Sequence, residues 1–150
     1  MKEIEYKYLV DESKWNVLSK PEPQEIIQGF LSRSKELVVR VRVKGENGYL
    51  TIKGKSEGIA RTEFEYQIPV DEAKAILAEF SDKQIIKKRY EITDHGKTWE
   101  VDVFKGALEG LILAELEVES EDEQFTLPDW VTEDVSSNPN YFNAVLIDKC

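Results

Sequence analysis

The sequence has one cysteine, one histidine and one methionine among 150 residues, and these shortages exclude several classes of protein. Cys150 alone cannot form an intramolecular disulfide, so a hydrophobic core must hold the fold together and a reducing compartment, the cytoplasm, is expected. His95 lies in a predicted Asp-His-Gly turn, where a lone histidine is typically exposed, and it is assigned no catalytic or metal-binding role.

Basic residues are also few: the chain has 20 Lys and Arg against 30 Asp and Glu, which gives a formal net charge of −10. Such an acidic chain is not expected to bind nucleic acid or an anionic membrane, although a local basic pocket stays open. No apolar run approaches the length of a membrane span, and no export signal precedes the first predicted strand. A length of 150 residues predicts a single domain over residues 1–150.

What the sequence has in abundance is charge that alternates with apolar residues. The first ten residues place Glu3, Glu5 and Lys7 on one face of a strand and apolar residues on the other, with a period of two. The same alternation recurs in residues 39–44, 51–55, 61–66, 87–90 and 115–119. Like charges stacked along one face repel one another unless opposite charges face them. A ligand with many charges would supply that compensation.

Periodicity and turn signals together predict a mainly β fold of the α+β class. Strands are predicted at 1–10, 24–31, 36–44, 48–55, 60–68, 84–93, 97–104 and 111–119, and helices at 11–18, 70–80 and near the C-terminus. Asp71 is the expected cap of the second helix, and Gly29 marks a bulge or a close approach to the backbone. The hairpin order favours an eight-stranded antiparallel closed β-barrel with flanking helices.

The charged faces of these strands can point outward to water or inward to the barrel lumen. An apolar interior is the usual arrangement in small barrels. The predicted helices have apolar stripes that need a partner, however, and helices on the outside would turn the charged faces inward. The pattern alone leaves both arrangements open, because buried charges are costly unless they are paired or bind a ligand.

Eight segments, in order along nearly the whole chain, resemble the CYTH superfamily of triphosphate tunnel metalloenzymes. Glu3-Ile4-Glu5-Tyr6-Lys7 matches the ExExK signature of that family, and Gln28-Gly29-Phe30-Leu31 is similar to its QGYL segment. The other similar segments are Val39 to Arg42, Leu50 to Gly54, Arg61 to Glu65, Lys87 to Tyr90, Trp99 to Phe104 and Gly110 to Glu117, with a tail from Trp130 to Leu146 that includes Tyr141 and Asn143.

The resemblance implies an eight-stranded tunnel that binds a triphosphate together with a divalent metal. The residues expected to bind the phosphates are Arg40, Arg42, Lys53, Arg61, Lys87 and Arg89. The residues expected to hold Mg²⁺ or Mn²⁺ are Glu3, Glu5, Asp102, Glu115 and Glu117. The expected catalytic residues are Lys7, Glu63 and Glu65, with the two glutamates ligating metal or positioning the attacking water.

Several of these roles have an alternative. Arg61 either joins the phosphate binders or orients the neighbouring glutamates, and Asp102 either ligates metal or pairs with an arginine across the tunnel. Lys7 either binds phosphate or acts as a base. Many short bacterial members of that family have tyrosine where this chain has Phe30. If that hydroxyl helps to activate water in them, this protein must use Lys7 or a glutamate instead, or turn over more slowly.

The first functional hypothesis is metal-dependent hydrolysis of a small triphosphate, most simply inorganic tripolyphosphate. The alternatives are adenylate cyclase, thiamine triphosphatase and a non-catalytic polyphosphate-binding module. Cyclases that resemble this chain carry a His-Phe pair before ExExK, which is not seen here, so hydrolysis is preferred. The expected partner is the small-molecule substrate; nucleic acid and membrane are not expected, and a homodimer through the outer faces is left open.

Overall fold

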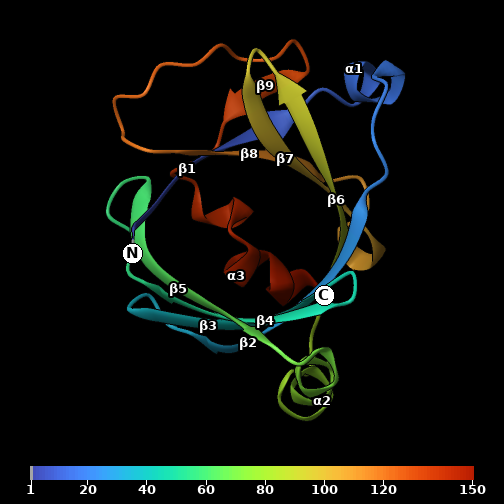
Figure 1. The fold of residues 1–150 in the computed structure, drawn as a ribbon, viewed down its shortest axis with the longest axis vertical. Helices are drawn as coiled ribbons and strands as arrows, with labels where there is room; N and C mark the ends of the chain where they lie inside the picture. Colours follow the sequence, from blue (N-terminus) through green and yellow to red (C-terminus); the bar gives the residue numbers. More distant parts are fainter. Residues whose placement is uncertain (1) are drawn as a thin grey trace.

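Eight antiparallel strands close into a barrel in the computed structural model, which describes residues 2–150 (Figure 1). The strands are β1 (Lys2–Val10), β2 (Gln24–Arg33), β3 (Leu37–Lys44), β4 (Asn47–Gly54), β5 (Ala60–Ile68), β6 (Ile85–Asp94), β7 (Lys97–Phe104) and β8 (Ile112–Val118). Their order is β1-β5-β4-β3-β2-β6-β7-β8, and β8 pairs with β1 to close the ring. The predicted closed barrel is confirmed.

The sequence did not predict a ninth strand, β9 (Val131–Asp134), which adds to β1 beside the barrel. It has four residues, three of which are polar, so no apolar alternation identifies it. Backbone pairing with β1 at Tyr8 and Val10 brings the chain to the end of the barrel where β1 finishes. The C-terminal tail starts from this point.

Two helices pack against the outside of the barrel, as expected. Helix α1 (Glu12–Val17) begins after Asp11, whose carboxylate accepts a hydrogen bond from the backbone of Lys14. Helix α2 (Val70–Phe80) begins after Pro69, and no side chain caps it, so the prediction that Asp71 is the cap was wrong. Asp71 lies in the first turn instead, where its negative charge interacts favourably with the helix dipole.

The apolar outer faces of the strands form two clusters under these helices. Trp15 of α1 packs with Trp99, Trp130 and other residues on the outside of β1, β7 and β8. Ala73 and Leu77 of α2 cover the outer face of β3. A Cβ at Gly29 would collide with Ser81 and Leu77, so the glycine marks the close approach of α2. The apolar faces therefore point outward and the charged faces point inward.

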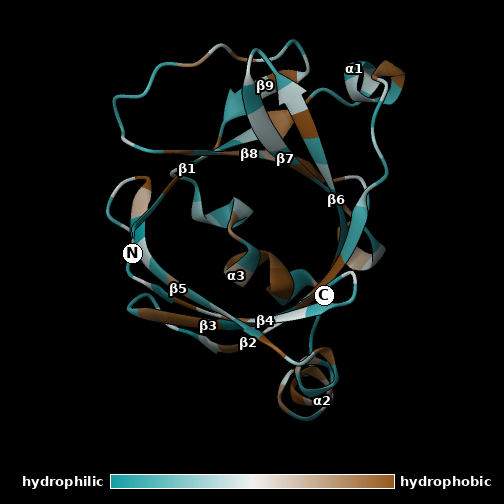
Figure 2. Ribbon diagram, viewed as in Figure 1, coloured by the Kyte–Doolittle hydropathy of each residue, from teal (hydrophilic) through white to brown (hydrophobic). Residues whose placement is uncertain are grey.

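The C-terminal tail lies inside the barrel (Figure 1), whereas the sequence predicted only a helix in this part of the chain. Figure 1 shows α3 (Asn143–Leu146) within the ring of strands, between the short 3₁₀ turns η2 (Pro139–Tyr141) and η3 (Ile147–Lys149). Figure 2 shows hydrophobic residues in α3 as well as in the outer helix α2. Leu146 and Ile147 pack on buried Ile85, Phe104 and Leu113, so an apolar plug fills one end of the barrel.

A third 3₁₀ turn, η1 (Gly106–Leu108), joins β7 to β8. No helix among residues 2–150 has the length and apolar character needed to cross a bilayer.

Candidate active site

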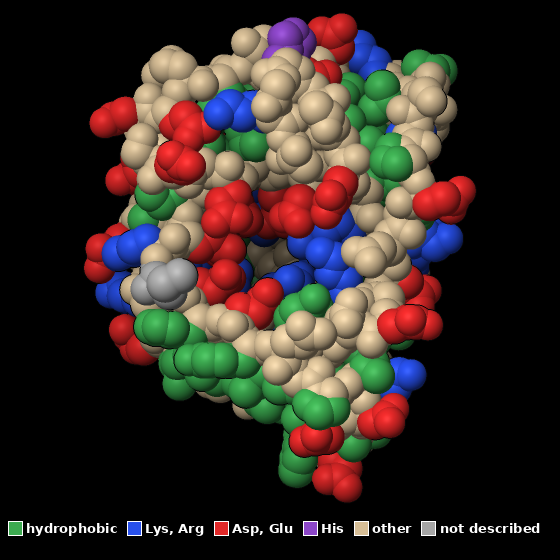
Figure 3. All heavy atoms as spheres, viewed as in Figure 1, with side chains coloured by type: hydrophobic (Ala, Val, Ile, Leu, Met, Phe, Trp, Pro, Cys, Tyr) green, Lys and Arg blue, Asp and Glu red, His purple; other side chains and the backbone are tan. Residues whose placement is uncertain are grey.

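The interior of the barrel contains a cavity of about 650 Å³ with strongly charged walls. Figure 3 shows its mouth, where acidic side chains lie along one side and basic side chains along the other. Every site residue predicted from the sequence lines this cavity except Asp102. The inward orientation arises because the inward positions of neighbouring strands are in register, for example Glu5 beside Glu117 and Lys53 beside Glu63.

Two arginines of β3 form one wall of the cavity together with Glu65 of β5. The Glu65 carboxylate lies 3.4 Å from Arg40 NH2 and 3.3 Å from Arg42 NH2. It also accepts a 2.8 Å hydrogen bond from Thr51, which in turn accepts one from Arg40. Burial raises the pKa of Glu65, but Arg42, Thr51 and Arg40 hold it below its ordinary value. Glu65 is therefore a fixed anion in this wall.

A second basic group lies on β6 and is built around Asp102 of β7. Arg89 donates to both carboxylate oxygens of Asp102, and Lys87 Nζ lies 2.9 Å from Oδ2. Asp102 is only 1% exposed, and although burial raises its pKa, Arg89 and Lys87 hold it below the ordinary value. Arg89 also reaches Glu115 at 3.1 Å and Glu100 at 3.3 Å. Asp102 thus holds the two cations from behind the cavity wall.

Carboxylates come together in two pairs on β1, β8 and β5. Glu5 and Glu115 share a hydrogen bond; burial and then the Glu115 charge raise the pKa of Glu5 well above its ordinary range. Burial opposes ionisation of Glu115 as well, but Lys7 and the Glu5 hydrogen bond hold its pKa well below the ordinary value. The two pKa values therefore move apart, and Glu115 loses its proton more readily than Glu5 does.

Glu3 and Glu63 form the second pair, with Lys53 between them. Lys53 Nζ lies 3.1 Å from Glu3 and 3.2 Å from Glu63. Burial and the neighbouring Glu3 raise the pKa of Glu63, although Lys53 opposes the shift. Glu117 lies beside these pairs, and its pKa is raised by burial and then by the charges of Glu3 and Glu100.

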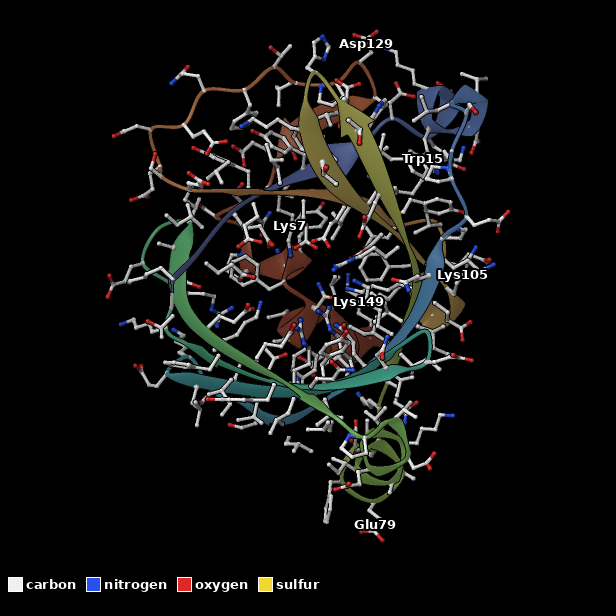
Figure 4. The ribbon with its side chains drawn as sticks, viewed as in Figure 1. Lys7, Trp15, Glu79, Lys105, Asp129 and Lys149 are labelled. Atoms are coloured by element: carbon white, nitrogen blue, oxygen red, sulfur yellow. The ribbon has the colours of Figure 1, made fainter. Side chains whose placement is uncertain are left out.

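Lys7 points into the barrel from β1 (Figure 4). Its Nζ donates to the backbone oxygen of Tyr141 at 3.2 Å and lies 3.7 Å from Glu115. The side chain is buried beneath the ring of Phe142. Lys7 therefore connects the carboxylate wall to the C-terminal tail.

Arg61 has a different neighbourhood from the other predicted phosphate binders. Its Nε and NH2 donate to the Gly54 carbonyl oxygen at 3.0 and 2.8 Å. These bonds tie the end of β4 to β5, so much of the guanidinium group supports the turn between the two strands. Its side chain still lines the cavity.

Sequence reasoning assigned no role to four polar residues that the structure places in or beside the site: Gln28, Thr51, Glu100 and Asn143. Thr51 and Glu100 could have been found, because each lies two residues before a predicted site residue and so faces the same side of its strand. Asn143 carries no such signal, since the tail has no strand periodicity and reaches the site only through the tertiary fold.

The carboxylates fit a hard divalent cation in part. Two carboxyl pairs in mutual contact need a proton or a cation between them, and oxygen ligands are what Mg²⁺ and Mn²⁺ prefer. Across residues 2–150, however, no three Asp, Glu, His or Cys side chains are grouped closely enough to hold a metal by themselves. Mg²⁺ commonly takes one or two carboxylates and completes its shell with substrate phosphates and water. The donor set suits a metal that is bound together with a phosphorylated ligand.

Comparison with known proteins identifies what this chain is similar to. The CYTH domain family model matches residues 1–146. An inorganic triphosphatase of Acetivibrio thermocellus is 44% identical over 97% of this chain and 93% of its own length. An inorganic triphosphatase of Nitrosomonas europaea is 33% identical over 79% of this chain and 81% of its own length.

The solved structures agree with the sequence comparison. The crystal structure of an inorganic triphosphatase superposes with a TM-score of 0.67 at 30% identity. The superposition covers 97% of this chain and 93% of the other chain. The shared region therefore includes the barrel and nearly all of the tail.

Proposed function

Since this chain belongs to the CYTH domain family, we propose that it is a triphosphatase that hydrolyses inorganic tripolyphosphate inside its barrel. Both curated relatives are inorganic triphosphatases, and one of them is 44% identical over nearly the whole chain. Residues 1–150 are proposed to act as one domain, because strands from the whole length of the chain close the ring.

The observation that carries the proposal is the cavity inside the barrel, where buried cations and buried carboxylates come together. Tripolyphosphate is a polyanion, so cations already desolvated in a protein wall bind it more strongly than cations in water do. Arg40 and Arg42 each have a buried Nε without a hydrogen-bond partner in the described part of the chain. Both residues also line the cavity, and guanidinium groups bind phosphate through paired hydrogen bonds.

We assign the phosphate contacts to the side chains that line the cavity, namely Arg40, Arg42, Lys53, Lys87 and Arg89, with Arg61 contributing from its turn. Asp102 is proposed to position Lys87 and Arg89 and not to bind metal, because both of its oxygens are already engaged. The sequence left open a pairing with an arginine across the tunnel, whereas Arg89 lies on the neighbouring strand, in register with Asp102.

The residues proposed to hold Mg²⁺ or Mn²⁺ are Glu3, Glu5, Glu115 and Glu117, in company with phosphate oxygens of the substrate. When bound, the cation would act as a Lewis acid that withdraws charge from the transferred phosphoryl group. Protein cations add to that stabilisation, since Arg89 contacts Glu115 and faces the same cavity.

Geometry separates the three predicted catalytic residues. Two arginines and Thr51 all contact Oε2 of Glu65, so we propose that this carboxylate positions Arg40 and Arg42. Lys7, with a carbonyl and a carboxylate as partners, is proposed to orient the phosphate as a cation. Glu63 has Lys53 and Glu3 as neighbours and faces the cavity, so it is the proposed acceptor of the proton from the attacking water.

Phosphate release from tripolyphosphate, ATP and thiamine triphosphate, measured by malachite green in Mg²⁺ and in Mn²⁺, tests the proposal. We expect release from tripolyphosphate in at least one metal and little release in EDTA. Tight binding of tripolyphosphate without release would indicate a binding module, and cyclic AMP formed from ATP would indicate a cyclase. Either result overturns the proposal. The cytoplasmic location and the oligomeric state stay predictions.

A further inference from the structure

The C-terminal tail brings the side chain of Asn143 to the buried ammonium group of Lys87. Asn143 Oδ1 lies 3.0 Å from Lys87 Nζ and 2.9 Å from Gln28 Nε2. Lys87 is 1% exposed and Gln28 is fully buried. These contacts form where α3 lies inside the ring of strands (Figure 1), and Asn143 also lines the cavity.

The chemistry of the contacts determines which way the Asn143 amide faces. An ammonium group has no acceptor, so the atom beside Lys87 Nζ must be the amide oxygen of Asn143. Gln28 must then present its amide nitrogen to the same oxygen, and its own Oε1 is left buried without a partner. An unpaired buried acceptor is unfavourable. The network therefore gives the Lys87 ammonium group a hydrogen-bond acceptor but leaves the Gln28 amide oxygen without a donor.

Asn143 and Asp102 together determine the direction of the Lys87 ammonium group. One of its three N–H donors points to Asp102 Oδ2 at 2.9 Å and another to Asn143 Oδ1. The third donor is the one left for the cavity that Lys87 lines. Asn143 holds the ammonium group without adding a negative charge, so the positive charge is not cancelled further by this contact.

The tail is held tightly enough to place Asn143 reproducibly. Lys7 donates to the backbone of Tyr141, and Arg33 donates to the Ala144 carbonyl at 2.9 Å and to Asp148 at 2.7 Å. Leu146 is buried in the apolar cluster at this end of the barrel. The segment that carries Asn143 is thus fixed by hydrogen bonds on both sides and by apolar packing.

We propose that Asn143 is a positioning residue that directs the Lys87 ammonium group toward a phosphate of the substrate. The inference rests on the proposed function, because it assumes that Lys87 binds a triphosphate. It makes the C-terminal tail part of the phosphate site as well as a closure of the barrel. A neutral acceptor is required at this position, and an aspartate would hold Lys87 equally well but would cancel its charge.

The test compares N143A and N143D with the wild-type protein in steady-state phosphate release from tripolyphosphate and in calorimetric binding of tripolyphosphate in EDTA. We expect N143A to raise KM and Kd about tenfold, the effect of one charge-assisted hydrogen bond, with a smaller change in kcat. We expect N143D to weaken binding at least as much, although it has the same shape and keeps both acceptor contacts. N140A is the matched control, because Asn140 is an exposed residue of the same tail.

Combining N143A with K87M tests whether Asn143 acts through Lys87. We expect N143A to change the Kd less than twofold when Lys87 is already absent. If K87M does not fold, as judged by circular dichroism, the test depends on the binding measured for N143D. A purely structural role for Asn143 predicts wild-type binding in N143D and equal losses in both backgrounds, and either result overturns the inference.

Failure of the inference is distinguishable from failure of the proposed function. If the wild-type protein releases phosphate from tripolyphosphate and N143A and N143D match it in KM, the inference is wrong and the proposed function stands. If the wild-type protein neither binds nor hydrolyses tripolyphosphate, both are wrong.

Discussion

Arg89 donates two parallel hydrogen bonds to Asp102, 2.7 Å from Nε to Oδ1 and 2.9 Å from NH2 to Oδ2. Lys87 shares the same carboxylate, so one buried anion supports two buried cations. The group is an internal support of the barrel wall, and the cations that it orients face the cavity. Stability and substrate binding therefore depend on the same carboxylate.

Replacing Asp102 by asparagine should destabilise the protein strongly. The substitution removes the buried carboxylate charge that Arg89 and Lys87 share, and breaking a buried ion pair from one side costs about 3–5 kcal/mol. Urea denaturation of D102N measures the loss. The control is E100Q, because Glu100 is partly exposed and forms its one ion pair among residues 2–150 with Arg89, so its loss should be under about 1 kcal/mol. Equal stabilities for D102N and E100Q would contradict the assigned role of Asp102.

Thr51 should matter more than its size suggests. Its buried hydroxyl donates to Glu65 and accepts from Arg40, so T51V removes both bonds and leaves those partners less satisfied. We expect a loss of about 1–3 kcal/mol in the free energy of unfolding and weaker tripolyphosphate binding. T98V, at an exposed position of β7, makes the same chemical change and should be nearly neutral. A neutral T51V would show that the hydroxyl does not organise this wall.

Glu115 should be required for turnover. The E115Q variant keeps the shape of the side chain but removes the ionised carboxylate that pairs with Glu5, Lys7 and Arg89. We expect kcat to fall by a factor of about 10² or more, with a folded protein by circular dichroism. E119Q, at an exposed position past the end of β8, serves as the control. Full activity of E115Q would remove the proposed metal assignment of Glu115.

Binding of tripolyphosphate should weaken as the pH rises above 8. Burial lowers the pKa of Lys87 to about 8, so the free protein loses this cation as the pH passes through that value. A bound phosphate keeps Lys87 protonated, so binding takes up a proton and the affinity falls by up to about tenfold per pH unit above 8. Calorimetry from pH 7 to 9.5 measures the slope.

The control for this pH effect is K87R, since an arginine keeps its charge over the whole range. Its affinity should change little above pH 8, and any slope that remains belongs to the ligand or to other groups. A wild-type affinity independent of pH, or the same slope in K87R, would show that Lys87 does not titrate near 8 or does not contact the phosphate.

Ligand and metal together should raise the melting temperature. A bound phosphate supplies negative charge to the cations that line the cavity, and a ligand at 100 times its Kd adds about 2.7 kcal/mol of stability. For a chain of this size that is a shift of roughly 5–10 °C, measured by differential scanning fluorimetry with tripolyphosphate and Mg²⁺. Mg²⁺ alone should give a smaller shift, because no three protein ligands are grouped for it in residues 2–150. If Mg²⁺ alone raised the melting temperature as much as Mg²⁺ with tripolyphosphate, the metal would not need the phosphate to bind.

Local sequence was enough to predict the eight barrel strands, the two outer helices and the side of each strand that carries charge. These features repeat with the period of a strand or a helix, and the alternation in β1 already puts Glu3, Glu5 and Lys7 on one face. The resemblance to a known family then selected the inward orientation, which the helices on the outer face explain physically.

Only the tertiary structure determined where the tail lies and which partner each inward charged side chain contacts. Asn143 reaches Lys87 across more than fifty residues of sequence, and no local pattern predicts that contact. In the sequence Asp102 and Glu115 are both inward acidic residues of a strand. In the structure Asp102 is buried behind two cations, whereas Glu115 lines the cavity. Periodicity determines the face on which a side chain lies, whereas its partner and its exposure depend on what the rest of the chain places opposite it.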